Sequence, residues 1–189
     1  MGHKIMFADI ILAKLRKNKV LKYIPENGVV CDIGCGPELK LLLSVRGAIS
    51  EGWAIDKKTI DRPIAGNIRA IEQDMDTHPV LPLPDNKFDC LLMMAVLEHM
   101  TLPREAIDEA FRILKPGGVL LLTTPSPEAK PILEFLAFKL RIISREEILD
   151  HKHYFSKQEL YQILTKAGFK KIEHHYFELG LNQFIVAQK

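Results

Sequence analysis

Residues 29–38 have the sequence Val29-Val30-Cys31-Asp32-Ile33-Gly34-Cys35-Gly36-Pro37-Glu38, which is the most informative segment for the fold. Its first five residues are apolar or β-branched apart from one aspartate, which is typical of a short buried strand. Two glycines then break the strand. The run 37–43 predicts a helix with Pro37 near its first position, where the missing N–H costs nothing. Because glycine has no Cβ, a ligand can approach the backbone at Gly34 and Gly36 and accept its hydrogen bonds.

A second strand, residues 52–56, ends in an acidic residue. Asp56 lies twenty residues after Gly36, and an acidic residue at this distance binds the ribose hydroxyls in Rossmann-like folds. A carboxylate suits a diol because it accepts two hydrogen bonds at once. Leu39 stands where the dinucleotide fingerprint G-x-G-x-x-G needs its third glycine. An NAD(P)-dependent oxidoreductase therefore stays an alternative, although the incomplete fingerprint counts against it.

Length and composition indicate one globular domain over residues 1–189. The chain is 47% hydrophobic and 26% charged, which is ordinary for a globular protein. Its formal charge of +2, with the basic residues spread along the chain, gives no case for a nucleic-acid partner. No apolar run reaches the roughly 18 residues that span a bilayer, and no secretory signal is evident. We therefore expect a cytoplasmic protein without a transmembrane segment.

Strands and helices alternate along the rest of the chain. Further strands are expected over residues 68–71, 88–94, 119–123, 170–177 and 181–187, and an N-terminal helix with a basic face over 6–23. Ser156 and Glu159 form a capping-box pattern for a helix over 157–167. Residues 125–150 form a strongly apolar insertion after the fifth strand. Ligands bind at the carboxyl ends of strands in open α/β sheets, so this insertion is expected to be a lid over the site.

Several segments, in this order, resemble motifs of the class I S-adenosylmethionine (AdoMet)-dependent methyltransferases. The resemblance is to their ubiquinone/menaquinone-biosynthesis-like branch, methyltransferase type 11. The segments are D-x-G-x-G at 32–36, the proline-rich run that ends in Phe88-Asp89, L-E-H at 97–99, R-x-L-K-P-G-G at 112–118, and the run from His151 to Phe169. The resemblance covers residues from about 28 to 187. It implies an α/β Rossmann-like sheet of seven strands in the order 3-2-1-4-5-7-6, with the last strand antiparallel and helices on both faces.

The same resemblance implies AdoMet as cofactor, S-adenosylhomocysteine as product, and a set of cofactor contacts. Asp56 and Lys57 would lie at the ribose. Asp74, with Asp76 as its rival, would bind the adenine amino group beside Met75. The glycine turn and the end of the fourth strand complete the set with Asp32, Gly34, Cys35, Gly36, Met94 and Ala95. Glu38 stands where the family often has a third glycine, so a non-catalytic AdoMet-binding or interaction module stays open as the second reading.

The methyl acceptor is expected to be a small molecule, a lipid or a saccharide. An O–H or N–H acceptor must lose a proton, and His99 or His153 is the expected base, with His151 beside them, because the histidine pKa suits that role. A structural histidine is the alternative for each. The histidine pairs 151/153 and 174/175 lack further ligands at known spacing, so no metal site is expected. Peripheral membrane contact and a homodimer stay open.

Overall fold

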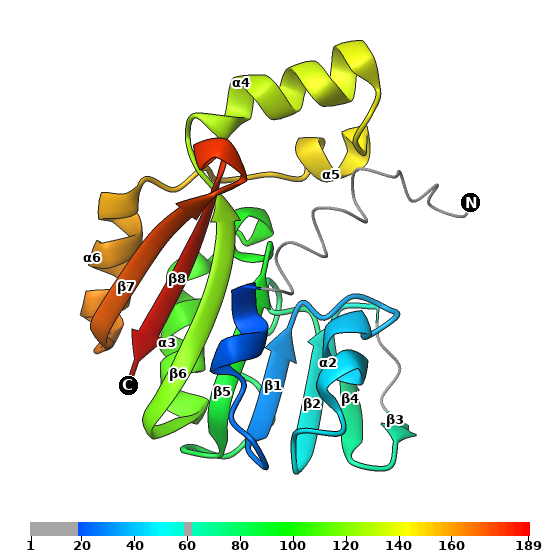
Figure 1. Ribbon diagram of the computed structural model, residues 1–189, viewed down its shortest axis with the longest axis vertical. Coiled ribbons are helices and arrows are strands. Elements are labelled where there is room, and N and C mark those ends of the chain that lie inside the picture. Colours follow the sequence, from blue (N-terminus) through cyan, green and yellow to red (C-terminus); the bar gives the residue numbers. More distant parts are fainter. Residues whose placement is uncertain (1–18, 59–61) are drawn as a thin grey trace.

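A computed structural model describes residues 19–58 and 62–189 and shows one eight-stranded sheet in the order β3-β4-β2-β1-β5-β6-β8-β7 (Figure 1). Most of the helix expected over residues 6–23 lies outside the described residues, which include only its end, with a 3₁₀ turn η1 (Leu21–Tyr23). The strands are β1 (Val29–Ile33), β2 (Glu51–Asp56), β3 (Arg62–Ala65), β4 (Ile68–Glu72), β5 (Phe88–Met94), β6 (Leu114–Pro125), β7 (Lys170–Phe177) and β8 (Asn182–Gln188).

The sheet confirms the expected topology and adds one strand. β4, β2, β1, β5 and β6 run parallel, β8 runs antiparallel to β6, and β7 runs antiparallel to β8. Without β3, this is the order 3-2-1-4-5-7-6 with the last strand antiparallel. The extra strand β3 pairs antiparallel with β4 at the sheet edge. Its four residues include Pro63, and so short a segment carries too little alternation to be recognised in the sequence.

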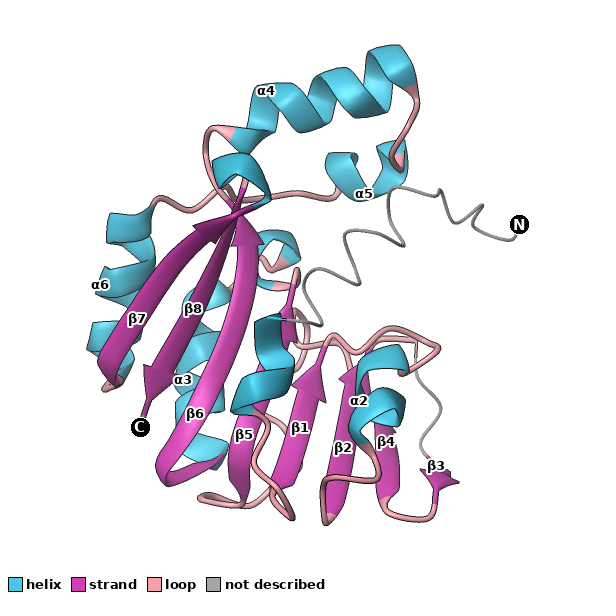
Figure 2. Ribbon diagram, viewed as in Figure 1, coloured by secondary structure: helices cyan, strands magenta, loops and turns pink. Residues whose placement is uncertain are grey.

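Both faces of the sheet are covered, as a mostly parallel sheet requires. Alternate residues of β5 enter two different cores: Leu91 and Met93 one, Cys90 and Leu92 the other. Helices α3 (Pro103–Ile113) and α6 (Lys157–Ala167) pack together and contribute to the first core. Helix α2 (Lys40–Val45) contributes to the second. Figure 2 shows α2 on the opposite side of the sheet from α3 and α6.

The helix after the glycine turn begins three residues later than expected. The helix α2 starts at Lys40, and Pro37 and Glu38 belong to the turn. The reason is Leu39, which adopts a left-handed conformation (φ 53°) and is only 2% exposed. Burying this side chain in the second core fixes a backbone conformation that a right-handed helix cannot contain.

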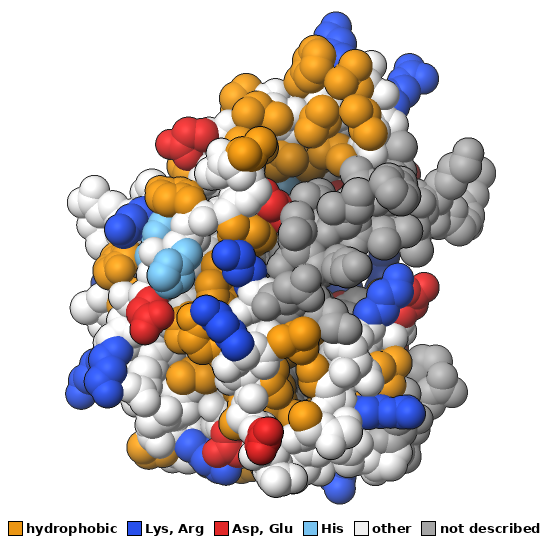
Figure 3. Space-filling view, viewed as in Figure 1, with side chains coloured by type: hydrophobic (Ala, Val, Ile, Leu, Met, Phe, Trp, Pro, Cys, Tyr) orange, Lys and Arg blue, Asp and Glu red, His pale blue; other side chains and the backbone are white. Residues whose placement is uncertain are grey.

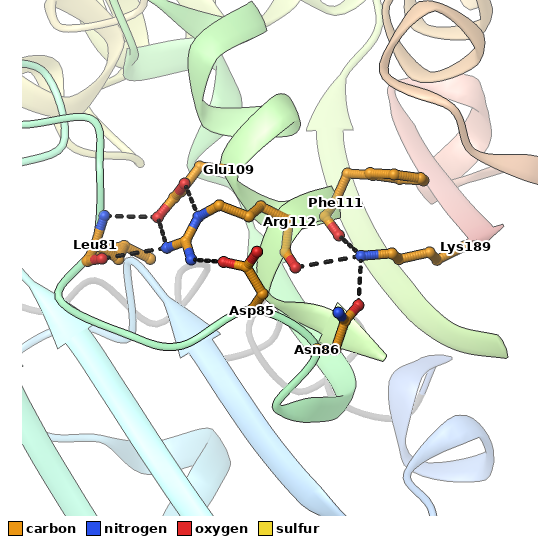
Figure 4. A network of polar contacts seen from close by, with 7 residues as sticks. All are labelled: Leu81, Asp85, Asn86, Glu109, Phe111, Arg112 and Lys189. Carbon is orange, nitrogen blue, oxygen red and sulfur yellow. Dashed lines mark hydrogen bonds and ion pairs between the residues drawn. The ribbon is translucent and has the colours of Figure 1, made fainter. Parts of the chain in front are cut away.

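The R-x-L-K-P-G-G run joins α3 to the proline-rich segment before β5. Arg112 donates to Glu109, to the Leu81 carbonyl and to the Asp85 carboxylate, and Glu109 accepts the Leu81 N–H at 2.6 Å (Figure 4). The C-terminal Lys189 donates to the carbonyls of residues 111 and 112 and to the Asn86 side chain. Two separate segments of the resemblance are therefore parts of one structural network.

The insertion after β6 contains a short helix α4 (Ala129–Glu134), a π-helical segment η3 (Phe135–Leu140) and a helix α5 (Arg145–Leu149). Figure 1 shows these elements beyond the end of β6, on the side to which the parallel strands point. Ser144 caps α5 by accepting the Glu147 N–H. The capping box of Ser156 and Glu159 at α6 is complete, which confirms that expectation.

Candidate active site

A pocket of about 760 Å³ lies at the carboxyl ends of the parallel strands. Its walls come from the ends of β1, β2, β4 and β5 and from the insertion after β6. Open α/β sheets bind ligands at this edge, next to the strand where the order reverses, which here is β1 between β2 and β5. The pocket is therefore the place to test the expected site residues.

The glycine turn is fixed to β2 and cannot carry a side chain at Gly34. A Cβ at Gly34 (φ +72°) would lie 2.3 Å from Val96 Cγ2, so the turn and the end of β5 are in direct contact. The N–H groups of Gly34 and Cys35 donate to the Ile55 carbonyl at 2.7 and 3.3 Å. Gly34 lines the pocket, whereas Cys35 and Gly36 do not. Around Gly36 (φ +69°), no atom of the described residues other than its chain neighbours lies within 4 Å of where a Cβ would stand.

Asp56 bridges the end of β2 and the turn. Its Oδ2 accepts the Gly36 N–H at 2.9 Å, and its Oδ1 accepts the Lys58 N–H at 3.0 Å. Each carboxylate oxygen has two lone pairs, so the group can accept ligand hydroxyls as well. Asp56 and Lys57 both line the pocket. The backbone bonds hold the carboxylate at the position where the sequence predicts the ribose.

Asp32 lies in the interior near the end of β1, just before the turn, and not in the pocket. Its side chain is 2% exposed and does not line the pocket. Burial, assisted by the negative charge of Asp56, raises the pKa of Asp32 to about 8. Asp32 is therefore an interior group of β1 next to the turn, not a group that faces the pocket.

Of the two acids expected at the adenine, Asp76 is held by other protein groups. The N–H and hydroxyl of Thr101 and the Lys152 ammonium all donate to its carboxylate, at 2.6 to 2.9 Å. Burial raises the pKa of Asp76, but these hydrogen bonds outweigh it and the net shift is downward. Asp74 is exposed, lines the pocket, and accepts the Asp76 N–H at 3.0 Å through Oδ1. Buried Met75 lines the pocket beside it.

The end of β5 places Met94 and Ala95 opposite the glycine turn. Both line the pocket. Ala95 has a left-handed backbone (φ 56°), and its N–H donates to the carbonyl and the hydroxyl of Thr123, both at 3.0 Å. A non-glycine residue in this region is uncommon and is often found at functional sites. The bend brings Val96 against Gly34 and closes this side of the pocket.

Two histidines, His99 and His151, meet on the far side of the pocket. Their ring centroids lie 4.8 Å apart, and both side chains line the pocket together with buried Glu98. His99 Nδ1 lies 3.1 Å from Asp150 Oδ2, and His151 Nδ1 lies 2.9 Å from the Tyr154 hydroxyl. His153, by contrast, stacks on Phe155 at 5.3 Å between ring centroids and does not line the pocket.

The sequence indicated both His99 and His151 as candidate bases. It did not indicate that Glu98 and Asp150 would lie beside them. Glu98 appeared only as part of L-E-H, and Asp150 only as the end of the insertion. The contact between η2 (Leu97–His99) and the residues after α5 joins segments about fifty positions apart, and no local pattern records it.

The insertion gives the pocket an apolar wall and has an apolar outer surface. Leu133, Leu136, Ile143 and Ile148 line the pocket. Figure 3 shows apolar side chains gathered on the outside of the same elements, where Ile132, Phe135, Leu140 and Ile142 are exposed. Within residues 19–58 and 62–189, no helix is long and apolar enough to cross a bilayer. Cys31, Cys35 and Cys90 form no disulfide within the described residues.

The chain matches a known protein family in sequence. A family model described as a methyltransferase domain matches residues 6–174. The ubiquinone/menaquinone biosynthesis C-methyltransferase UbiE of Pseudomonas putida (strain GB-1) is 28% identical over 142 residues, which are 66% of this chain and 53% of that protein. UbiE of Azotobacter vinelandii is 26% identical over 141 residues, which are 66% of this chain and 54% of that protein. This chain thus spans about half the length of the curated relatives it matches.

Solved structures share the fold. A SAM-dependent methyltransferase from Archaeoglobus fulgidus superposes with a TM-score of 0.67 at 19% identity, over 93% of this chain and 94% of that one. A structure described as the complex of the Haloferax volcanii Trm112 methyltransferase activator with a putative methyltransferase gives a TM-score of 0.69 at 17% identity, over 97% of both chains. At these identities the likeness concerns the fold alone.

Proposed function

The chain belongs to the methyltransferase domain family, and on this premise we propose that it binds AdoMet and transfers the methyl group to a small acceptor with an apolar body. The observation that carries the proposal is the pocket itself. It brings together Gly34, Asp56, Asp74 with Met75, and Met94 with Ala95, which come from four separate strand ends. These are most of the residues that the resemblance assigns to the cofactor.

The geometry supports one orientation of AdoMet. Asp56 would accept the ribose hydroxyls, because its carboxylate is held at the strand end by the Gly36 and Lys58 N–H groups. Asp74 and Met75 would hold the adenine, since Asp76 is bound to Thr101 and Lys152. Gly34 and the backbone of Met94 and Ala95 would lie along the methionine part. Asp32, Cys35 and Gly36 would support this site without lining the pocket.

Bound AdoMet supplies a methyl group on a positively charged sulfur, and the protein supplies position and environment. Leu133, Leu136 and Ile143 would exclude water from the acceptor side and pack against an apolar acceptor. We assign to residues 125–150 the role of a lid within a single domain. His99 lies on this acceptor side and His153 does not, so His99 is the residue we propose to act on the acceptor.

Two alternatives find less support in the structure. The non-catalytic reading depended on Glu38 restricting the turn, but the Glu38 side chain is exposed and pairs with Lys40. Its position does not need a left-handed backbone either, because among residues 37–39 only Leu39 has a positive φ. For the NAD(P)-dependent oxidoreductase hypothesis, the structure provides only the features that such enzymes share with methyltransferases.

Calorimetric titration with S-adenosylhomocysteine tests the proposal. We expect Asp56→Ala to weaken binding at least about tenfold, because charge-assisted hydrogen bonds contribute about 1.5–3 kcal/mol and 1.4 kcal/mol is tenfold. Glu72→Ala is the matched control, since Glu72 is exposed, pairs in register with Asp56 and does not line this pocket. Equal affinity in the wild type and Asp56→Ala would contradict the assignment.

A further inference from the structure

We propose that Glu98, His99 and His151 form a binding site for a divalent transition-metal ion, such as Zn²⁺, on the acceptor side of the pocket. One ligand atom from each residue lies within 4.8 Å of the others. All three side chains line the pocket. Glu98 is 1% exposed, and His99 and His151 are half-buried. Binding of the ion needs neither cofactor nor acceptor. Only the role that we give the ion in methyl transfer rests on the proposed function.

The backbone holds the two contributing segments together. The Glu98 carbonyl accepts the Lys152 N–H at 2.8 Å and the His153 N–H at 3.1 Å. These bonds join η2, which carries Glu98 and His99, to the residues directly after His151. The three side chains are therefore presented by a fixed junction rather than by a loose loop.

Both imidazoles have a protein oxygen close to Nδ1, as a hydrogen bond in the case of His151 and as an ion-pair distance without hydrogen-bond geometry in the case of His99. Asp150 Oδ2 lies 3.1 Å from His99 Nδ1, and the Tyr154 hydroxyl lies 2.9 Å from His151 Nδ1. A metal-binding histidine usually donates its second N–H to a carboxylate or another oxygen, which fixes the ring and its tautomer. Because Tyr154 engages Nδ1 of His151, Nε2 is the nitrogen with which His151 would bind the ion.

The donor set selects the class of ion. Two imidazoles and one carboxylate suit zinc and its neighbours, whereas all-oxygen sites suit Mg²⁺ and Ca²⁺. A cation between them would also offset the cost of keeping the Glu98 carboxylate buried. Sequence spacing did not predict these three ligands. The sequence pattern pairs His151 with His153, whereas Glu98 and His99 lie about fifty residues away along the chain.

The open side of the ion would face the pocket. Zinc sites with three protein ligands keep a position for water or substrate. An acceptor with an oxygen donor, such as a phenol or an enol, could occupy that position, and the cation would lower the pKa of its hydroxyl. His99 then serves as a ligand, and the acceptor class narrows to molecules with an apolar body and an oxygen that can bind a metal ion.

Titration of the chelator-stripped protein with ZnCl₂ alone tests the site. We expect one equivalent to bind the wild type, and His99→Ala, His151→Ala and Glu98→Gln each to weaken binding at least tenfold. His153→Ala is the matched control, because it removes a histidine of the same junction that does not line the pocket. His175→Ala controls for the exposed histidine beside Glu173. Both controls should bind like the wild type.

The visible spectrum of the Co²⁺-loaded wild type gives a second measurement that requires no variant. Ligand-field bands that Zn²⁺ displaces stoichiometrically support the site. Failure of the wild type to bind, or equal losses in the His153→Ala control, overturns the inference. S-adenosylhomocysteine affinity, measured on the same preparations, shows that each variant is folded. It also separates failure of the metal site from failure of the cofactor assignment.

Discussion

At the scale of single residues, Asp32 is a motif residue that lies outside the pocket. It belongs to D-x-G-x-G, yet its side chain is buried at the end of β1, and its pKa is raised to about 8, mainly by burial. An unfolded aspartate has an ordinary pKa near 3.8. Between these values the folded protein holds a proton that the unfolded chain releases, so the free energy of unfolding falls as pH rises.

Asp32→Asn should therefore flatten the dependence of stability on pH. We expect the wild type to lose stability between about pH 5 and pH 8. The variant should lack that part of the loss, because the amide that replaces the carboxyl group does not titrate. Urea unfolding at pH 5.5 and pH 8 measures the difference. Asp108→Asn, a change at an exposed position of α3, is the control. An unchanged slope in Asp32→Asn would show that the buried carboxyl does not titrate in this range.

The site residues differ in how far the sequence reveals them. The sequence places Gly34 in the turn after β1, and in the structure it lines the pocket, where its positive φ and the nearness of Val96 exclude a side chain. The sequence places Asp56 at the end of β2, and it also lines the pocket, while its contact with a ribose stays a prediction. Asp74 and Asp76 both line the pocket, and we propose Asp74 for the adenine because only the fold reveals that Thr101 and Lys152 engage Asp76. His151 gains its partners in the same way, through contacts between distant segments.

At the scale of elements, the network in Figure 4 anchors α3 to the segment before β5. Glu109 is 6% exposed and accepts from both Arg112 and the Leu81 N–H. We expect Glu109→Ala to lower the free energy of unfolding by roughly 3 kcal/mol, because it leaves the Leu81 N–H without its acceptor and removes one of the carboxylates that pair with the Arg112 guanidinium. Chemical denaturation measures the loss, and Asp108→Ala, the exposed neighbour, should cost less than about 0.5 kcal/mol.

A loss below about 1 kcal/mol in Glu109→Ala would contradict the structural role of this network.

The helices and strands also show which boundaries the sequence patterns do not predict. The position of α6 followed from its sequence pattern and its cap, the Ser156 box. The start of α2 did not, since Leu39 is a good helix former whose left-handed backbone is imposed by burial. The K-P-G-G turn is likewise part of β6, with Gly117 at φ +82°.

At the scale of the whole molecule, the topology came from recognising several motifs in order rather than from any one of them. Alternating strands and helices predicted a parallel sheet, and the resemblance supplied the strand order, which the structure confirms. The edge strand β3 and the π-helical turn in the insertion have no counterpart in the sequence patterns. Both depend on neighbours that only the folded chain provides.

A crystal structure of this protein with bound S-adenosylhomocysteine would show directly where the cofactor lies. We expect density in the pocket, with the ribose at the Asp56 carboxylate, the adenine beside Met75 and the sulfur near Gly34 and Ala95. Density for the nucleoside elsewhere on the sheet, or a ribose that makes no contact with Asp56, would contradict this assignment.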